Sequence, residues 1–210
     1  MSELWLIRHG ETEWNLLRRV QGMLNIALND QGREQARRLP AHFQVTPPGA
    51  HAIYSSDLDR AHHTAQPTAE LLGLPIRLDA GLRERQYGVF QGLSFVELAQ
   101  RHPDVAEAVR RRMPDFDMQG GESLRKFQER VVTTLDALAR KHPGERVLVF
   151  THSGVIDMAY RYAHGIPLEA ERRRSMLNVS INRIAVADGR WTTSNWGDVS
   201  HLVEVAEDAV

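Results

Sequence analysis

Short apolar runs of β type, separated by segments of helical character, most constrain the fold of this chain. Four such runs lie at residues 4–7, 52–55, 76–78 and 147–150. Strands that alternate with helices indicate an α/β fold with a largely parallel sheet. Towards the C-terminus, residues 180–187 and 191–195 flank Asp188-Gly189, a sequence typical of a β-hairpin turn. We therefore predict a mostly parallel central sheet with an antiparallel edge strand.

Three helices can be placed from their periodicity and from the signals at their ends. The clearest begins after Ser123 and ends before Pro143-Gly144. Its apolar residues recur at helical spacing, at Leu124, Phe127, Val131, Leu135 and Leu138. A second helix is expected over 59–72, with Gly73 as its stop signal, and residues 94–97 form a capping box that opens a third. The apolar stripes should cover the sheet.

The composition excludes several classes of protein. With 210 residues, 42% of them hydrophobic, and no repeat or linker, the chain is expected to form a single domain over 1–210. The absence of cysteine excludes disulfides, thiolate metal sites and a cysteine nucleophile. A net charge of -1 provides no electrostatic basis for nucleic-acid binding, and the apolar run at 4–7 is too short to span a membrane. We therefore expect a cytoplasmic protein without nucleic-acid or membrane partners.

Polar side chains follow the predicted strands at the points where these end. Arg8 and His9 follow the first strand, Arg60 lies just beyond the second, and His152 follows the fourth. Glu84 comes a few residues after the third strand. Because open α/β sheets bind ligands at the carboxyl ends of their strands, we expect these side chains to share one crevice. Two arginines and two histidines favour a dianionic phosphoryl group as the ligand.

The same residue types can perform phosphoryl transfer. One imidazole nitrogen can attack phosphorus if the other is held by an acceptor, which gives a phosphohistidine. Fixed guanidinium groups stabilise the charge on the equatorial oxygens, so that neither a metal nor another cofactor is required. Glu84 can protonate the leaving oxygen and then act as a base toward water. Simpler interpretations remain open: a core histidine at His152, and a surface ion pair for Glu84, which stands between two arginines.

Several motifs along most of the chain resemble those of the histidine phosphatase superfamily, the phosphoglycerate mutase-like group. They are Arg8-His9-Gly10-Glu11-Thr12 with Trp14-Asn15, Gln21-Gly22, the segment 55–61 with Thr64-Ala65, Leu82-Arg83-Glu84 with Tyr87-Gly88 and Gly92, Gly121-Glu122-Ser123, and the segment 151–156. The resemblance implies a three-layer α/β/α sandwich.

The resemblance also implies a role for each matching residue. It implies His9 as the phosphorylated residue, Glu84 as the proton donor and His152 as the second pocket histidine. It implies Arg8, Asn15 and Arg60 as phosphate ligands and places Gln21-Gly22 in a pocket loop. We also expect Tyr87 and Ser153, which belong to these motifs, to contact substrate. The adjacent His62 and His63 lack the spacing of a zinc pair, and no metal site is expected.

Two departures from the family pattern favour hydrolysis over isomerisation. Cofactor-dependent phosphoglycerate mutases carry a lysine where Phe95 stands, and a longer insertion before the second histidine motif. We therefore predict a metal-independent phosphatase acting on a small phosphorylated metabolite. A phosphoglycerate mutase is the first alternative, and a non-catalytic phospho-ligand binding module is the second. The physiological ester and the oligomeric state, with a homodimer as one option, stay open. Segments 110–118 and 166–176 are candidates either for specificity determinants or for subunit contacts.

Overall fold

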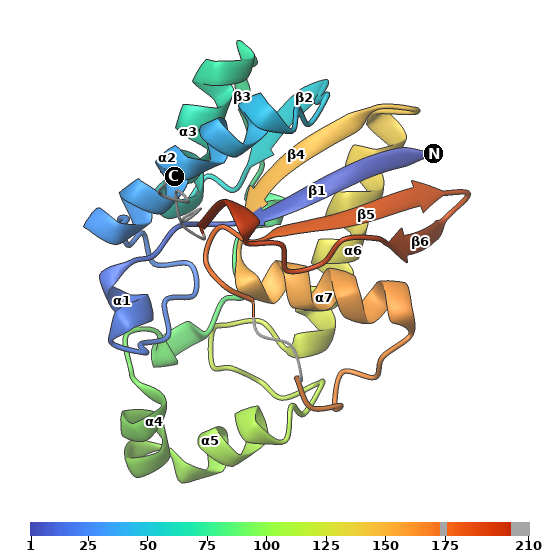
Figure 1. Ribbon diagram of the computed structural model, residues 1–210. Coiled ribbons are helices and arrows are strands. Elements are labelled where there is room, and N and C mark those ends of the chain that lie inside the picture. Colours follow the sequence, from blue (N-terminus) through green and yellow to red (C-terminus); the bar gives the residue numbers. More distant parts are fainter. Residues whose placement is uncertain (173–175, 203–210) are drawn as a thin grey trace, which may run out of the picture.

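A central sheet of six strands organises the computed structural model, which describes residues 1–172 and 176–202 (Figure 1). The strands are β1 (Ser2–Arg8), β2 (Ala52–Ser55), β3 (Ile76–Leu78), β4 (Arg146–Thr151), β5 (Ile181–Ala187) and β6 (Arg190–Thr193), in the order β3-β2-β4-β1-β5-β6. The first four strands are mutually parallel, whereas β5 runs antiparallel to β1 and pairs in the antiparallel sense with β6 at the edge. The predicted sheet, with its antiparallel edge, is confirmed.

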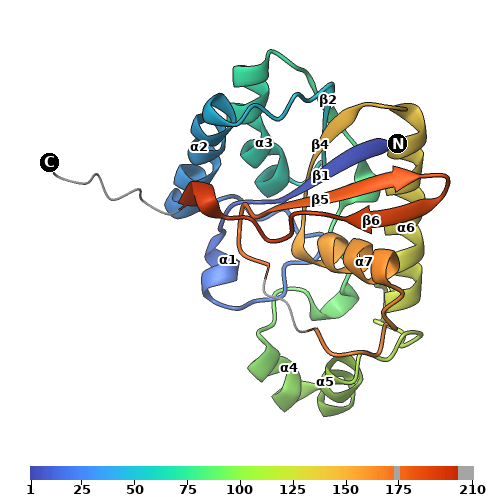
Figure 2. The same cartoon turned by 45° about the vertical axis from the view of Figure 1, so that its right-hand side comes forward.

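Helices cover both faces of this sheet (Figure 2). Helices α2 (Asp30–Val45) and α3 (Asp59–Leu72) lie on one face, and α6 (Leu124–Lys141) and α7 (Ser153–His164) on the other. Successive residues of β1 alternate between the layers: Leu4 and Leu6 pack on the α6–α7 side, Trp5 and Ile7 on the α2–α3 side. Full burial of each such side chain contributes roughly 1.5–3 kcal/mol. The predicted three-layer sandwich is confirmed.

The local signals at the ends of the predicted elements act as expected. Gly73 ends α3 with a φ of 62°, in the left-handed conformation that glycine tolerates. Ser123 caps α6 by accepting a hydrogen bond from the N–H of Lys126. The hairpin turn between β5 and β6 has positive φ at Asp188 (49°) and Gly189 (72°), as a type I′ turn requires.

A pair of short helices, α4 (Phe95–Arg101) and α5 (Pro103–Arg110), stands apart from the sheet (Figure 1). The predicted capping box opens α4. The pair has its own small apolar cluster, formed by Phe90, Leu98, Val105 and Met118. The other elements are α1 (Glu13–Leu16), η1 (Ala80–Leu82), η2 (Gly88–Phe90) and η3 (Ser200–Leu202). Within the described residues, no helix is both long enough and apolar enough to cross a bilayer.

Candidate active site

His9 is buried directly after β1, where its backbone N–H donates to the carbonyl oxygen of Thr151, the last residue of β4. Its Nδ1 lies 2.7 Å from the carbonyl oxygen of Gly10. Because a carbonyl only accepts, Nδ1 carries the proton and Nε2 keeps its lone pair. Burial, and then the charges of Arg60 and Arg8, hold the pKa of His9 well below its usual value. The imidazole is therefore neutral, as a nucleophile must be.

The second histidine lies beside the first. The rings of His9 and His152 have their centroids 5.2 Å apart, and His152 is fully buried. Its Nε2 lies 2.9 Å from the hydroxyl oxygen of Ser56, which follows β2. Three strand ends, those of β1, β2 and β4, therefore meet at this pair. Burial, followed by the charge of Arg60, lowers the pKa of His152 as well.

Two buried arginines supply positive charge next to His9. Arg60 is fully buried and its Nη1 and Nη2 donate to the carbonyl oxygens of Leu24 (2.8 Å) and Gly22 (2.7 Å). Each of these nitrogens carries two protons, so one on each is left for a ligand. Arg8 is held by the carbonyl oxygen of Met176. Burial is the main cause that lowers the pKa of both arginines to about 10, at which both stay charged near neutral pH.

Asn15 is oriented by the start of α1. Its Oδ1 accepts a hydrogen bond of 3.1 Å from the backbone N–H of Thr12, in a capping box. The side-chain amide of Asn178, just before β5, donates to the carbonyl oxygen of His9 (2.9 Å) and reaches Asn15 Oδ1 at 3.4 Å. With Oδ1 so engaged, the Nδ2 amide of Asn15 is the group available to an anion.

Glu84 faces the beginning of α7. Its Oε2 accepts from the backbone N–H of Gly154 (2.9 Å) and lies 3.4 Å from the Ser153 hydroxyl oxygen. Its Oε1 accepts from the N–H of Arg85 (2.8 Å). The interpretation of Glu84 as a surface ion pair is wrong, because Arg83 pairs with Asp57 instead. The carboxyl group therefore lies in the crevice.

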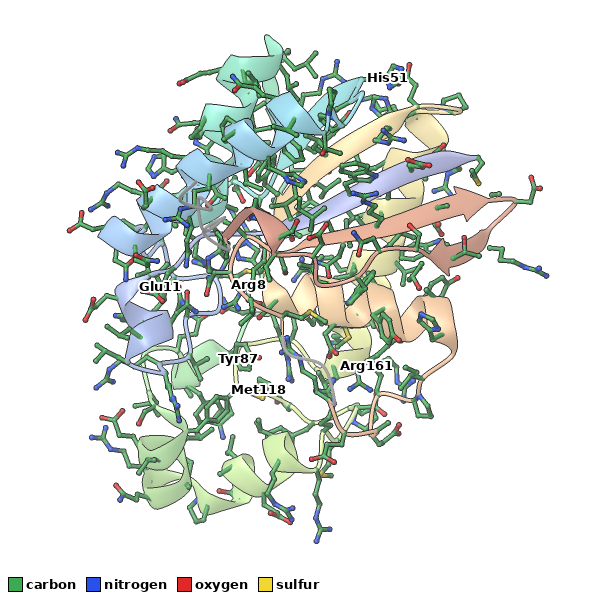
Figure 3. The ribbon with its side chains drawn as sticks, in the orientation of Figure 1. Arg8, Glu11, His51, Tyr87, Met118 and Arg161 are labelled. Atoms are coloured by element: carbon green, nitrogen blue, oxygen red, sulfur yellow. The ribbon has the colours of Figure 1, made fainter. Side chains whose placement is uncertain are left out.

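One cavity brings the expected residues together. A cavity of about 200 Å³ is lined by nine of the ten predicted site residues: Arg8, His9, Asn15, Gln21, Gly22, Arg60, Glu84, Tyr87 and Ser153. The tenth, His152, is fully buried next to the ring of His9 and is not among the lining residues. Figure 3 shows Arg8 at the end of β1 and Tyr87 between it and the α4–α5 pair. The cavity is small, strongly cationic and suited to a phosphoryl group.

Sequence reasoning missed the residues that position this site. They are Ser56, Thr64, Arg130, Asp157 and Asn178. Arg130 is the clearest case: from α6 it donates to the carbonyl oxygens of Gly81, Arg83 and Glu84 and forms an ion pair with Glu122. No local pattern distinguishes such residues from surface polar ones, although Ser56 and Thr64 did lie inside a family motif.

The two segments proposed for specificity lie near the site. In the first, Arg110 and Arg111 are exposed and share Glu107, whereas Arg112 is largely buried and binds Asp157. In the second, Arg172 lines the phosphate cavity. Arg173 and Arg174, which complete its arginine run, lie outside the described residues. In the part of the chain that is described, no three His, Asp or Glu side chains are grouped to hold a metal ion.

Known proteins resemble this chain along almost its whole length. Residues 4–199 match the model of the histidine phosphatase superfamily (branch 1). Phosphoglycerate mutase-like protein 4 of Arabidopsis thaliana is 42% identical over 97% of this chain and 88% of its own. A metal-independent phosphoserine phosphatase of the same plant is 36% identical over 98% and 85%. Among solved structures, Bacillus stearothermophilus YhfR superposes with a TM-score of 0.89, at 31% identity, over 97% of this chain and 100% of that one.

Proposed function

The chain belongs to the histidine phosphatase superfamily, and we propose that it hydrolyses phosphate monoesters through a phosphohistidine formed on His9. It is a phosphoric monoester hydrolase. The observation that carries the proposed mechanism is the state of His9: a neutral ring, held at Nδ1 by Gly10, in a cavity with two charged arginines.

In the first step, Nε2 of His9 attacks phosphorus and the bond between phosphorus and the ester oxygen breaks. Arg8, Arg60 and the Asn15 amide bind the equatorial oxygens, where charge accumulates. Glu84 in its protonated form donates its proton to the leaving oxygen, so that the product departs as an alcohol.

In the second step, water attacks the phosphohistidine. Glu84, now a carboxylate, accepts a proton from the water, the bond between phosphorus and Nε2 breaks, and inorganic phosphate leaves. His9 and Glu84 return to their starting states. His152, held by Ser56, lies beside His9 as a second neutral ring.

Phe95 supports hydrolysis over the mutase alternative. Its side chain, more than half exposed, lines the phosphate cavity at the place where mutases carry a lysine. A mutase must retain a doubly phosphorylated intermediate while it reorients, and an apolar ring offers no charge for that purpose. The intact set of His9, Glu84 and His152 argues against a binding module without catalytic activity.

The proposed substrate is a small phosphorylated metabolite, as for the metal-independent phosphoserine phosphatase to which the chain is similar. A cytoplasmic location without nucleic-acid or membrane partners is part of the same proposal, and rests on the near-neutral charge and the absence of cysteine.

The direct test is release of phosphate from p-nitrophenyl phosphate and a panel of phosphorylated metabolites in the presence of EDTA. We expect turnover by the wild type, none by His9→Ala, and a phosphorylated His9 peptide after rapid quenching. A wild-type rate in His9→Ala would exclude the mechanism. Incubation with 3-phosphoglycerate and a trace of 2,3-bisphosphoglycerate tests the mutase alternative, which formation of 2-phosphoglycerate without free phosphate would support.

A further inference from the structure

We propose, on the basis of the proposed function, that the alcohol half of the preferred substrate is bulky and carries a second anionic group, which Arg172 and Arg85 bind in a chamber beyond the phosphate cavity. The chamber, its apolar walls and its incompletely paired cations are three separate observations that lead to this class of substrate.

The chamber adjoins the phosphate cavity. Its volume is about 830 Å³, against about 200 Å³ at His9. The two spaces share Tyr87, Phe95 and Arg172 in their walls, so a substrate whose phosphate lies at His9 extends past these residues into the chamber. Binding sites for drug-sized molecules have about 300–1,000 Å³. A three-carbon alcohol would leave most of this space to water.

Much of the chamber wall is apolar. Apolar side chains come from α4 and α5 on one side and from α6 and α7 on the other: Ala99, Ala106, Val109, Leu124, Phe127 and Met158. Phe95 stands at the entrance with more than half of its surface exposed. Burial of a ring or an aliphatic chain against these walls removes apolar surface from water and so stabilises the complex. The walls therefore favour a bulky group with an apolar face.

A cluster of three arginines around one carboxylate leaves positive charge at the entrance. Asp157 on α7 is nearly buried and binds Arg112 at 3.1 Å and Arg161 at 3.0 Å through the same oxygen. Arg172 lies 3.9 Å from the other oxygen, with a side chain that is 34% exposed. Three cations thus share one anion. Arg172 is the least tightly held of them and lines both spaces.

Arg85 contributes a second cation from inside the chamber wall. It is 5% exposed, and none of the described carboxylates lies within ion-pairing distance of its guanidinium group. Its Nε donates to the carbonyl oxygen of Glu122, and its guanidinium lies 5.1 Å from the centre of the Tyr87 ring. Burial lowers the pKa of Arg85. An anion bound next to the guanidinium group would raise this pKa again.

The side chain of Tyr87 lies within the electrostatic influence of both Arg85 and Arg172. Burial is the main cause that raises the pKa of Tyr87, and the charges of Arg85, Arg172 and Arg112 act on it in the opposite direction. Glu169 and Glu171 also line the chamber, but both are exposed, and water screens their charge. An anionic group of the substrate, a carboxylate or a phosphate, would therefore bind near Tyr87 to two guanidinium groups whose N–H donors are only partly engaged within the protein.

A matched series of esters tests the proposal. The probes are 2-naphthyl phosphate, 6-carboxy-2-naphthyl phosphate, naphthalene-2,6-diyl bisphosphate and glycerol 1-phosphate, each assayed for kcat/KM with the full-length protein. We expect both anionic naphthyl esters to exceed 2-naphthyl phosphate by roughly 10- to 100-fold, the effect of one or two hydrogen bonds to charged groups. Comparison of the carboxylate with the phosphate then identifies the anion that the chamber prefers.

Two variants separate charge from size. Arg172→Gln should lower kcat/KM for the carboxylated ester at least tenfold more than for 2-naphthyl phosphate. Ala106→Trp, which fills the chamber from α5, should lower kcat/KM for the naphthyl esters at least tenfold more than kcat/KM for glycerol 1-phosphate. Arg101→Gln, at an exposed arginine of α4 outside the chamber, is the matched control. It should change neither the ratio of kcat/KM between the carboxylated and the neutral naphthyl ester nor the ratio between the naphthyl esters and glycerol 1-phosphate.

The proposal is overturned if the wild type does not distinguish the anionic from the neutral naphthyl ester, or if both variants leave the ratios unchanged. Thermal unfolding tests whether each variant is folded. If one variant does not fold, the other still tests its own part of the proposal, the anionic group for Arg172→Gln and the bulk of the alcohol for Ala106→Trp. A wild type that hydrolyses none of the esters, nor p-nitrophenyl phosphate, refutes the proposed function itself. Hydrolysis without preference refutes only the anionic chamber.

Discussion

The backbone N–H of Gly154 donates a hydrogen bond of 2.9 Å to Oε2 of Glu84. Gly154 is the second residue of α7, so the first turn of a helix that begins directly after His152 also fixes the proposed acid. A Cβ atom at position 154 would stand 2.0 Å from Oε1 of Glu84 and 3.0 Å from the Phe127 ring. Only glycine leaves room for the carboxyl group in this position.

Gly154→Ala should therefore displace Glu84 and weaken protonation of the leaving group. General acid catalysis contributes typically 10²- to 10⁴-fold, and we expect a loss of roughly 100-fold in kcat for alkyl phosphates. p-Nitrophenyl phosphate, whose leaving group needs little protonation, should lose much less. Steady-state kinetics with both esters measures the difference, and equal losses for the two would contradict the assignment of Glu84 as acid.

Arg130 should matter to the site although it lies outside the cavity. It joins α6 to three carbonyl oxygens of the 81–84 loop and to Glu122, with side chains that are about one-fifth exposed. Arg130→Met should lower the free energy of unfolding by about 2–3 kcal/mol and lower kcat, because the loop that carries Glu84 loses its anchor. Urea titration and kinetics are the measurements.

The control for this variant lies on the same helix. Arg125 pairs with Asp115 at the surface, where both side chains are more than half exposed. Arg125→Met should change stability by no more than about 0.5 kcal/mol and leave kcat as it is. If both variants behave alike, the proposed role of Arg130 is excluded.

The proposed nucleophile should stay neutral in mildly acidic solution. Burial and the charges of Arg60 and Arg8 keep the pKa of His9 well below 6.5. In ¹⁵N-labelled protein, the ring signals assigned to His9 by comparison with His9→Gln should not shift between pH 7.5 and 6.0. Protonation of His9 near pH 6.5 would be incompatible with its electrostatic environment.

The C-terminal turn should loosen as the pH falls. Burial, and then His42 at a ring distance of 5.5 Å, lower the pKa of His201 to about 4, with Asp198 and Arg38 also nearby. In the unfolded chain the His201 imidazole binds a proton near pH 6.5, whereas in the folded chain it does so only near pH 4. The free energy of unfolding is therefore highest above pH 6.5 and decreases as the pH falls towards 4. Between pH 7.5 and 5, the free energy of unfolding should decrease by about 1 kcal/mol less in His201→Phe than in the wild type, a figure that allows for the partial exposure of His201. Urea titrations at the two pH values measure it, and an identical pH dependence would refute the assignment.

Most of the secondary structure followed from the sequence because its causes are local. The strand runs, the stop at Gly73, the Ser94 capping box and the Asp188-Gly189 turn each depend on a few neighbouring residues. Helices α2, α5 and α7 were not predicted, although α5 carries local signals of its own, with Pro103 at its start and Asp104 in its first turn. The extent of a single domain stays a prediction.

The sequence by itself indicated the proposed reacting groups, because strand ends and motifs point to His9, Arg60, Glu84 and His152 without knowledge of distant contacts. Only the tertiary structure decided what holds and surrounds them: Ser56 on His152, Arg130 beneath Glu84, and the chamber with Arg85 and Arg172. These depend on segments far apart in the chain that come together by packing. No local periodicity records that Asp157 would face three arginines. The proposed chemistry could therefore be predicted from the sequence, whereas the chamber that we propose selects the substrate arises from the fold.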